Sequence, residues 1–139
     1  MPVRSSEATW EGDLKNGEGT MALGSGAYEG SYSFLSRFED GEGTNPEELI
    51  GAAHAGCYAM ALSNDLASEG HDPERVHATA NVHLDMESLT IDTIELVVEA
   101  SVPEMDESTF MEYAEGAKEN CPVSRVLAGA EITLDATLV

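Results

Sequence analysis

The stretch "ELIGAAHAGCYAMALSNDL" (residues 48–66) predicts a buried helix and contains one of the two cysteines in the chain. A strong helix start precedes it, with Asn45 as N-cap, Pro46 at the first helical position and Glu48 three residues after the cap. We expect the helix to continue to Ser68. Its side chains are small on nearly every side, which favours burial between sheets or against a second copy in a dimer.

The segments on either side of this helix predict an α+β domain. Before the helix, three strands are predicted at residues 8–14, 17–23 and 29–35. After it come a two-stranded hairpin at 75–87 and 89–102, two helices at 107–119 and 121–129, and a last strand at 131–139. The resulting order, β-β-β-α-β-β-α-α-β, is typical of the α+β class. With 139 residues and no shift in composition, we expect a single domain over residues 1–139.

The charge of the chain excludes several partners. Asp and Glu number 27 against 6 Lys and Arg, giving a formal net charge of −21. Such a chain is not expected to bind nucleic acid or an anionic membrane. The apolar runs predict neither a membrane span nor a signal peptide, so we expect a cytoplasmic protein. We interpret the acidity as a halophile-like adaptation to molar salt, where repulsion is screened; an acidic mesophilic protein is the alternative.

The two cysteines differ in their local surroundings. Cys57 and Cys121 form no CxxC pair and lack the spacing of a zinc site, and a structural disulfide is not expected in the cytoplasm. A lone buried cysteine is usually inert packing, and that alternative stays open here. However, Cys121 directly precedes Pro122 at a helix start, where the helix dipole lowers a thiol pKa. Cys57 lies in mid-helix, so a cation must come from elsewhere to activate it.

Arg37 is the candidate cation. It lies just before the central helix, next to aromatic residues that could shelter it, and Glu47 could hold its guanidinium in a bidentate pair. Ten residues of helix separate Glu47 from Cys57, a rise of ~15 Å. If these two residues share a site, either the helix breaks or the site combines two subunits. This argument favours a dimer.

Other side chains allow both a functional and a structural interpretation. His54 lies one turn before Cys57 and could act as a base, but a packing role is favoured. His77 and His83 share one strand face and could bind a metal, but the favoured interpretation is that both are simply exposed on the surface. Aromatic residues that could line a substrate pocket, or simply pack in the core, are Phe34, Phe38 and Tyr58.

Two motifs resemble a known family. The stretch "RFEDGEGTNPEELIGAAHAGCYAMALS" (residues 37–63) resembles the first signature of the OsmC/Ohr family of thiol-dependent hydroperoxide reductases, and "NCPVSRVL" (residues 120–127) resembles the second. The opening "WEGDLKNGEGT" (residues 10–20) and the closing "AEITLDATLV" (residues 130–139) are similar to the OsmC branch. The resemblance therefore covers nearly the whole chain.

The resemblance implies a role for each candidate residue. Cys57 would be the peroxidatic thiolate that attacks the distal peroxide oxygen, releases an alcohol or water and becomes a sulfenic acid. Cys121 would be the resolving thiol, which condenses with the sulfenic acid to a disulfide that an external dithiol, such as a lipoylated protein, reduces. Arg37 would stabilise the thiolate and orient the peroxide, while Glu47 pairs with Arg37.

The resemblance also implies an assembly and a role in the cell. The family fold is an intertwined homodimer with β-sheets wrapped around two central helices and two active sites at the interface, without a metal or an organic cofactor. Its members reduce organic hydroperoxides, and in some cases hydrogen peroxide, under oxidative or osmotic stress. The competing function is a thiol redox sensor or binding protein that forms the Cys57–Cys121 disulfide without turnover. A third reading is a small structural dimer with inert thiols.

Overall fold

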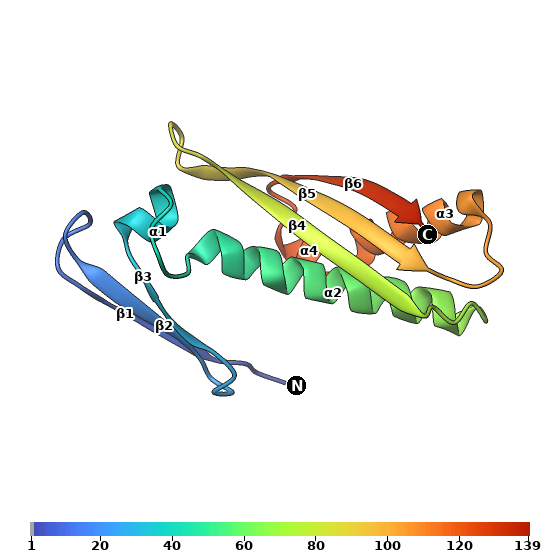
Figure 1. Cartoon of the computed structure of the whole chain (residues 1–139), viewed down its shortest axis with the longest axis horizontal. Coiled ribbons are helices and arrows are strands. Elements are labelled where there is room, and N and C mark those ends of the chain that lie inside the picture. The colour runs from blue at the N-terminus through green and yellow to red at the C-terminus, as the bar shows by residue number, and fades with distance from the viewer. Residues whose placement is uncertain (1) are drawn as a thin grey trace. The chain divides into compact units, whose positions relative to one another are not determined.

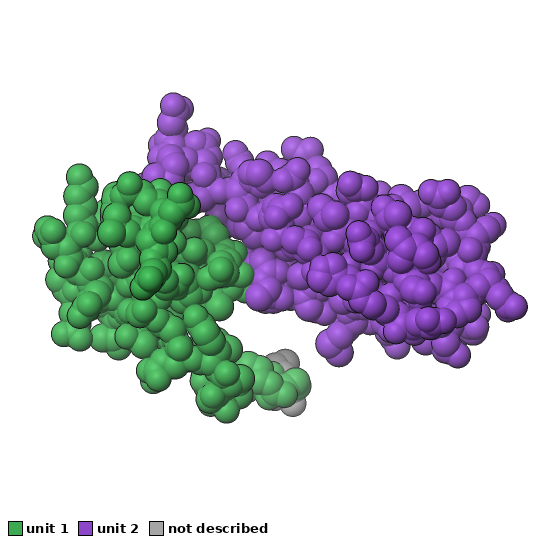
Figure 2. All heavy atoms as spheres, viewed as in Figure 1, with its two compact units in different colours: residues 1–49 green, residues 50–139 purple. Residues whose placement is uncertain are grey.

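The computed structural model describes residues 2–139 and divides them into two compact units. The first unit extends to Leu49 and the second comprises Ile50–Val139 (Figure 2). Each unit contains its own three-stranded sheet (Figure 1). The α+β class predicted from the sequence is confirmed.

The first unit is built on an antiparallel meander in the order β1-β2-β3. Its strands are β1 (Ser6–Glu11), β2 (Glu18–Leu23) and β3 (Glu29–Tyr32). The rings of Trp10 and Tyr32 meet at a centroid distance of 5.3 Å across Gly19, which pairs with both residues. A Cβ atom on Gly19 would lie 2.6 Å from the Tyr32 ring and 2.7 Å from the Trp10 ring. Only glycine therefore allows these two rings to approach each other here.

A short helix that the sequence pattern did not predict follows β3. The strand expected over residues 29–35 ends at Tyr32, and α1 (Phe34–Phe38) begins after the N-cap Ser33. Ser33 Oγ accepts from the Ser36 N–H at 3.2 Å, while Ser36 Oγ accepts from the Ser33 N–H at 2.8 Å. This reciprocal capping box stabilises a helix start. The sequence pattern did not predict this capping box, because Ser36 occupies the third helical position, where glutamate or glutamine is usual.

The second unit has a mixed sheet in the order β4-β5-β6. Strand β4 (Arg75–Asp85) and strand β5 (Thr90–Ser101) form the predicted antiparallel hairpin, and β6 (Glu131–Leu138) lies parallel to β5. Two helices, α3 (Glu107–Asn120) and α4 (Pro122–Val126), connect β5 to β6. Helix α3 has the predicted position, whereas α4 ends three residues before the predicted end at residue 129. A helical connection is the usual way to join parallel strands, which need a long crossover.

The central helix α2 (Pro46–Ser68) has the predicted bounds and is continuous. Asn45 Oδ1 accepts from the Glu48 N–H at 2.7 Å, as an N-cap should. Gly51 allows the helix to approach β4 closely, because a Cβ atom there would lie 3.2 Å from the Ala80 carbonyl oxygen. A Cβ atom on Gly56 would meet nothing within 4 Å. Within this chain, the close approach of another backbone that the helix glycines predict therefore occurs at Gly51 and not at Gly56.

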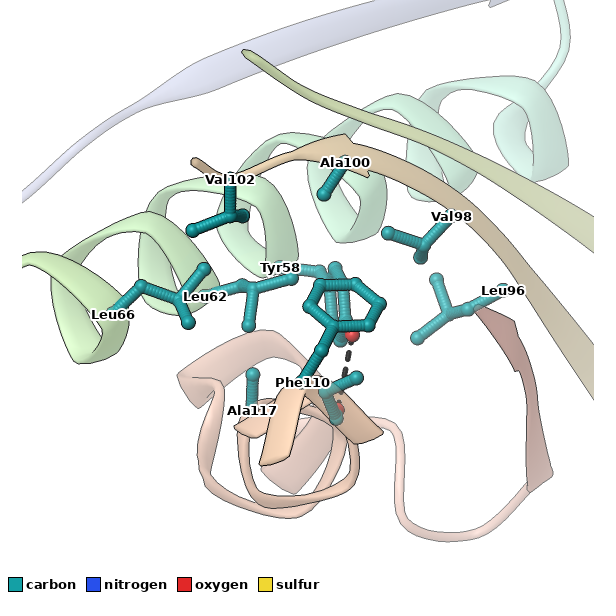
Figure 3. Packing of buried hydrophobic residues seen from close by; sticks show 10 residues of the cluster. Tyr58, Leu62, Leu66, Leu96, Val98, Ala100, Val102, Phe110 and Ala117 are labelled. Atoms are coloured by element: carbon teal, nitrogen blue, oxygen red, sulfur yellow. Dashed lines mark hydrogen bonds between the residues drawn. The ribbon is translucent and has the colours of Figure 1, made fainter. Parts of the chain in front are cut away.

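The core of the second unit lies between α2, β5 and α3 (Figure 3). Alternate residues of β5 face this core, since Leu96, Val98 and Ala100 are fully buried. Tyr58 on α2 is also fully buried, and its hydroxyl donates to the Ala114 carbonyl at 2.9 Å. The remaining buried members are Leu62, Leu66, Val102, Phe110, Ala114 and Ala117.

We expect Phe110→Ala to destabilise this core strongly. The ring is fully buried among side chains of α2 and β5, so truncation leaves a cavity that the neighbours fill only in part. The expected loss in the free energy of unfolding is about 4 kcal/mol. Urea unfolding followed by circular dichroism measures it, with exposed Glu112→Ala on the same helix as the control. A loss in Phe110→Ala no larger than in Glu112→Ala would contradict the assigned core.

No helix within residues 2–139 combines the length and apolar character that crossing a membrane requires.

Candidate active site

Arg37 and Glu47 form a bidentate ion pair in the first unit. Arg37 Nε and Nη2 donate to the two carboxylate oxygens of Glu47, each at 3.0 Å. The Glu47 side chain is 11% exposed and that of Arg37 is 37% exposed. The carboxylate thus anchors one edge of the guanidinium and leaves Nη1 outside the pair. Nη1 is a charged donor available to a ligand.

Hydrogen bonds between α1 and the start of α2 fix this ion pair. Ser36 Oγ donates to the Thr44 carbonyl at 2.7 Å, and Asn45 Nδ2 donates to the Ser36 carbonyl at 3.0 Å. Ser36 and Thr44 are both buried. These bonds hold the last turn of α1, which carries Arg37, beside the first turn of α2, which carries Glu47.

An aromatic cavity of about 260 Å³ adjoins Arg37 in the same unit. The Arg37 guanidinium lies 5.3 Å from the centre of the Phe38 ring, within cation–π distance. Apart from Arg37, the cavity is lined by Trp10, Leu14, Tyr32, Ser33, Phe34 and Phe38. A cavity with apolar walls and one fixed positive charge suits a small organic molecule with a polar end.

In the second unit, Cys57 on α2 meets Cys121 between α3 and α4. Their sulfur atoms lie 2.9 Å apart, and both residues are free thiols. Cys57 is partly exposed, whereas Cys121 is fully buried. A molecule from solvent can therefore reach the Cys57 sulfur, whereas the Cys121 sulfur is accessible only from within the protein.

The two thiols have opposite pKa shifts. Burial raises the pKa of Cys57, and its hydrogen bond to Cys121 raises it further. Burial also acts to raise the pKa of Cys121, but hydrogen bonds from Cys57, from the N–H groups of Ser124 and Val123 and from the Ser124 hydroxyl outweigh it and lower the pKa. Within this unit Cys121 is thus the more acidic thiol of the pair, and Cys57 needs a cation to lower its pKa.

His54 lies one turn before Cys57 on α2, and its ring contacts Ser124 on α4. The His54 ring is fully buried, and its Nε2 lies 2.7 Å from Ser124 Oγ. Its Nδ1 is buried and has no hydrogen-bond partner within residues 2–139. Burial lowers the pKa of His54, so the imidazole is neutral near pH 7.

The remaining candidate residues are two exposed histidines and three aromatic residues. His83 is exposed and contacts Glu95 on the neighbouring strand at 2.5 Å, and His77 is exposed on the same face. Throughout residues 2–139, no cluster of three or more His, Cys, Asp or Glu side chains could hold a metal ion. Tyr58 packs in the core of the second unit, while Phe34 and Phe38 line the cavity beside Arg37.

Sequence reasoning missed Ser124 and the walls of the cavity. Ser124 contacts His54 from a helix 70 positions away, and no pattern of consecutive residues signals that contact. Trp10 and Tyr32 come from separate strands, and only the register that pairs each of them with Gly19 brings them together.

Comparisons with known proteins agree on one family. The model of the family described as OsmC-like protein matches residues 39–136. The chain is 49% identical over 135 residues to Peroxiredoxin OsmC of Escherichia coli strain K12, an alignment that covers 95% of this chain and 94% of that protein. Peroxiredoxin OsmC of Shigella flexneri matches with the same identity and coverage.

Solved structures share the fold at low sequence identity. An OsmC-like protein of unknown function from Vibrio cholerae has a TM-score of 0.77 at 15% identity, covering 99% of this chain and 100% of that one. The organic hydroperoxide resistance protein OhrB of Bacillus subtilis has a TM-score of 0.67 at 19% identity, covering 96% and 98%.

Proposed function

Since this chain belongs to the OsmC family and is a thiol peroxidase related to peroxiredoxins, we propose that it reduces organic hydroperoxides through Cys57 and Cys121. The contact between the two thiols carries the proposal. A partly exposed sulfur lies 2.9 Å from a buried one, which is the arrangement that a two-cysteine peroxidase needs. The exposed thiol meets the peroxide and the buried thiol closes the disulfide.

The reaction divides into two steps at Cys57. Its thiolate attacks the distal peroxide oxygen, the O–O bond breaks, and the leaving alkoxide takes up a proton to become an alcohol. The resulting sulfenic acid then reacts with Cys121, forming the disulfide and releasing water. Arg37 stabilises the Cys57 thiolate and orients the peroxide through its Nη1, because Glu47 holds the other edge of the guanidinium.

The aromatic cavity beside Arg37 supports an organic substrate. Its lining rings include Trp10, Tyr32 and Phe34, which favour the apolar part of an alkyl or aryl hydroperoxide. Arg37 stands in the same cavity and binds the polar peroxide end. Hydrogen peroxide has no apolar part to bind there, so we expect it to react more slowly than cumene hydroperoxide.

In the proposed mechanism, Arg37 and Cys57 act together because they meet in a homodimer. Helix α2 is continuous, so Glu47 and Cys57 on one copy are separated by a rise of ~15 Å. A shared site requires either a broken helix or a site between subunits. Because the helix is unbroken, a site between subunits is favoured. Met60 on α2 is 77% exposed, and Gly56 has open space beside it. We infer that a second copy covers this face and that residues 1–139 act as one functional domain.

A dithiol completes the cycle by reducing the Cys57–Cys121 disulfide. Two exchange steps transfer the oxidised state to the reductant and restore both thiols. A lipoylated protein is our preferred candidate for this partner. In keeping with the net charge of −21, the surface of this partner that approaches the disulfide is expected to be basic or neutral.

The test is a peroxidase assay with cumene hydroperoxide and dihydrolipoamide in molar salt. We expect sustained, saturable peroxide consumption by the full chain. A single oxidation to the disulfide without further turnover would instead identify a redox sensor, and no reaction of either thiol would identify a structural protein with inert cysteines.

Cys121→Ser is expected to separate the two steps. The first turnover should proceed at the wild-type rate, because Cys57 is intact, but steady-state turnover should fall by about tenfold or more as the sulfenic acid loses its resolving thiol. Mass spectrometry of Cys57 should then find sulfinic acid accumulating with excess peroxide. Wild-type turnover without this over-oxidation would contradict the role of Cys121.

A further inference from the structure

A second contact joins the two parts of the chain that carry the thiols. His54 on α2 and Ser124 on α4 are both buried, and His54 Nε2 lies 2.7 Å from Ser124 Oγ. His54 stands three residues before Cys57, and Ser124 stands three residues after Cys121. The same two parts of the chain therefore meet twice, about one helical turn apart, once through the sulfur atoms and once through this hydrogen bond.

The backbone of α4 fixes the position of Cys121 relative to Ser124. Cys121 is the N-cap of α4, and its carbonyl accepts from the Arg125 N–H at 3.0 Å. Ser124 lies within the helical turn that this hydrogen bond closes. An interaction that holds the Ser124 side chain therefore also holds the main chain of Cys121.

Helix α4 needs an anchor on the rest of the protein. It has five residues, whereas isolated helices shorter than about 12–15 residues are only marginally stable in water. The hydrogen bond from Arg125 Nη2 to Asn120 Oδ1, at 3.3 Å, is exposed and connects α4 only to the adjacent end of α3. The buried bond between His54 and Ser124 instead ties α4 to the central helix.

Histidine is a costly residue for simple packing at position 54. Its Nδ1 is buried and has no hydrogen-bond partner within residues 2–139. An apolar side chain would avoid the free-energy cost of burying this unpaired polar atom. The hydrogen bond between Nε2 and Ser124 is what histidine provides here and an apolar side chain does not.

We propose that the His54–Ser124 hydrogen bond is a clamp that holds Cys121 within reach of Cys57 while Cys57 is a sulfenic acid. The proposal rests on the proposed function, because it takes Cys57 as the attacking thiol and Cys121 as the resolving thiol. His54 and Ser124 act through the position of Cys121 and are positioning residues. All four residues belong to the second unit, so the clamp does not depend on how two subunits are arranged.

The clamp matters most after the first step of the cycle. Oxidation of Cys57 replaces its thiol with a sulfenic acid, which changes the contact between the two sulfur atoms. The hydrogen bond between His54 and Ser124 involves neither sulfur and is kept through this step. A thiol held in place has an effective concentration far above that of a free thiol, so Cys121 reacts before a second peroxide does.

The closing step balances without another reagent. The Cys121 thiolate donates an electron pair to the Cys57 sulfur, so the S–S bond forms and the S–O bond of the sulfenic acid breaks. The oxygen leaves as hydroxide and combines with the proton that Cys121 has released, giving water. Cys121 is oxidised and the sulfenic sulfur of Cys57 is reduced. A disulfide is about 2.05 Å long, so sulfur atoms 2.9 Å apart approach by less than about 1 Å to form it.

The first test separates the two steps with one equivalent of cumene hydroperoxide. Intact mass of acid-quenched samples distinguishes the sulfenic acid from the disulfide. In Ser124→Ala the sulfenic acid should form at the wild-type rate, whereas the disulfide should close about tenfold more slowly. Equal closing rates in Ser124→Ala and wild type would overturn the clamp and leave the peroxidase chemistry standing.

Matched variants distinguish the clamp from a general loosening of the fold. Tyr58→Phe removes the buried hydrogen bond to the Ala114 carbonyl, which joins α2 to α3, and should close the disulfide at the wild-type rate. His54→Leu should slow closure as Ser124→Ala does. His54→Gln keeps a hydrogen-bonding nitrogen near the Nε2 position and should retain most of the rate. Slow closure in Tyr58→Phe, or equal rates in the two His54 variants, would contradict the proposal.

The second test needs no peroxide. The Cys57–Cys121 disulfide is equilibrated in buffers that differ in the ratio of oxidised to reduced glutathione. Ser124→Ala should shift this equilibrium about tenfold toward the two thiols, because the effective concentration of Cys121 beside Cys57 falls. An unchanged equilibrium would refute the clamp. A shifted equilibrium in a chain whose Cys57 forms no sulfenic acid would support the clamp and overturn the proposed peroxidase chemistry.

Discussion

Replacing Cys57 with serine is expected to reduce hydroperoxide consumption to the uncatalysed rate, a loss of at least about a thousandfold. A serine hydroxyl does not ionise near neutral pH, so the attacking atom is removed while the size of the side chain is kept. Consumption of cumene hydroperoxide with dihydrolipoamide measures the effect, and circular dichroism confirms that the variant is folded.

The matched control for this variant is Cys121→Ser, which removes the other thiol of the same pair. It should retain the first turnover that Cys57→Ser loses. If Cys57→Ser consumed peroxide at the wild-type rate, the attacking thiolate would have to be assigned elsewhere. Cys121 would then be the candidate, because its pKa is the lowered one of the pair.

The second large effect is expected for Arg37→Ala, with peroxidase activity reduced by about a hundredfold. Cys57 has a raised pKa in its own unit, so without the guanidinium less of it is thiolate at neutral pH. The remaining activity should therefore increase toward alkaline pH, as the thiol ionises without help. Activity measured from neutral to alkaline pH tests the magnitude and the direction together.

Arg37→Lys is the informative companion variant. Lysine keeps the positive charge but cannot form two parallel hydrogen bonds with Glu47, so an intermediate loss is expected. Equal activity in Arg37→Lys and wild type would mean that charge alone matters. Equal activity in Arg37→Ala and wild type would remove Arg37 from the site.

A mixture of two impaired variants tests whether the site spans subunits. Arg37→Ala supplies an intact Cys57, and Cys57→Ser supplies an intact Arg37. If these residues meet across a dimer, unfolding and refolding the two variants together restores one complete site in each mixed dimer. A mixture no more active than the two separate variants, although native mass spectrometry detects mixed dimers, would place both residues in one chain.

The sequence predicted the local elements well where a single segment carried the information. Asn45, Pro46 and Glu48 predicted the start of α2, and alternation predicted the β4–β5 hairpin, because caps and periodicity are properties of consecutive residues. Helix α1 was missed, because its capping box uses Ser36 where a glutamate is usual. The family was also evident from two motifs, and the comparisons confirmed it.

The sequence by itself thus determined the α+β class, the central helix and the identity of the two thiols. The tertiary structure decided which groups meet them. The contact of Cys57 with Cys121, separated by 64 positions, and of His54 with Ser124, separated by 70, depends on how α2 and α4 pack in the folded unit. The opposite pKa shifts of the two thiols follow from that packing, because burial and hydrogen bonding are set by neighbours in space.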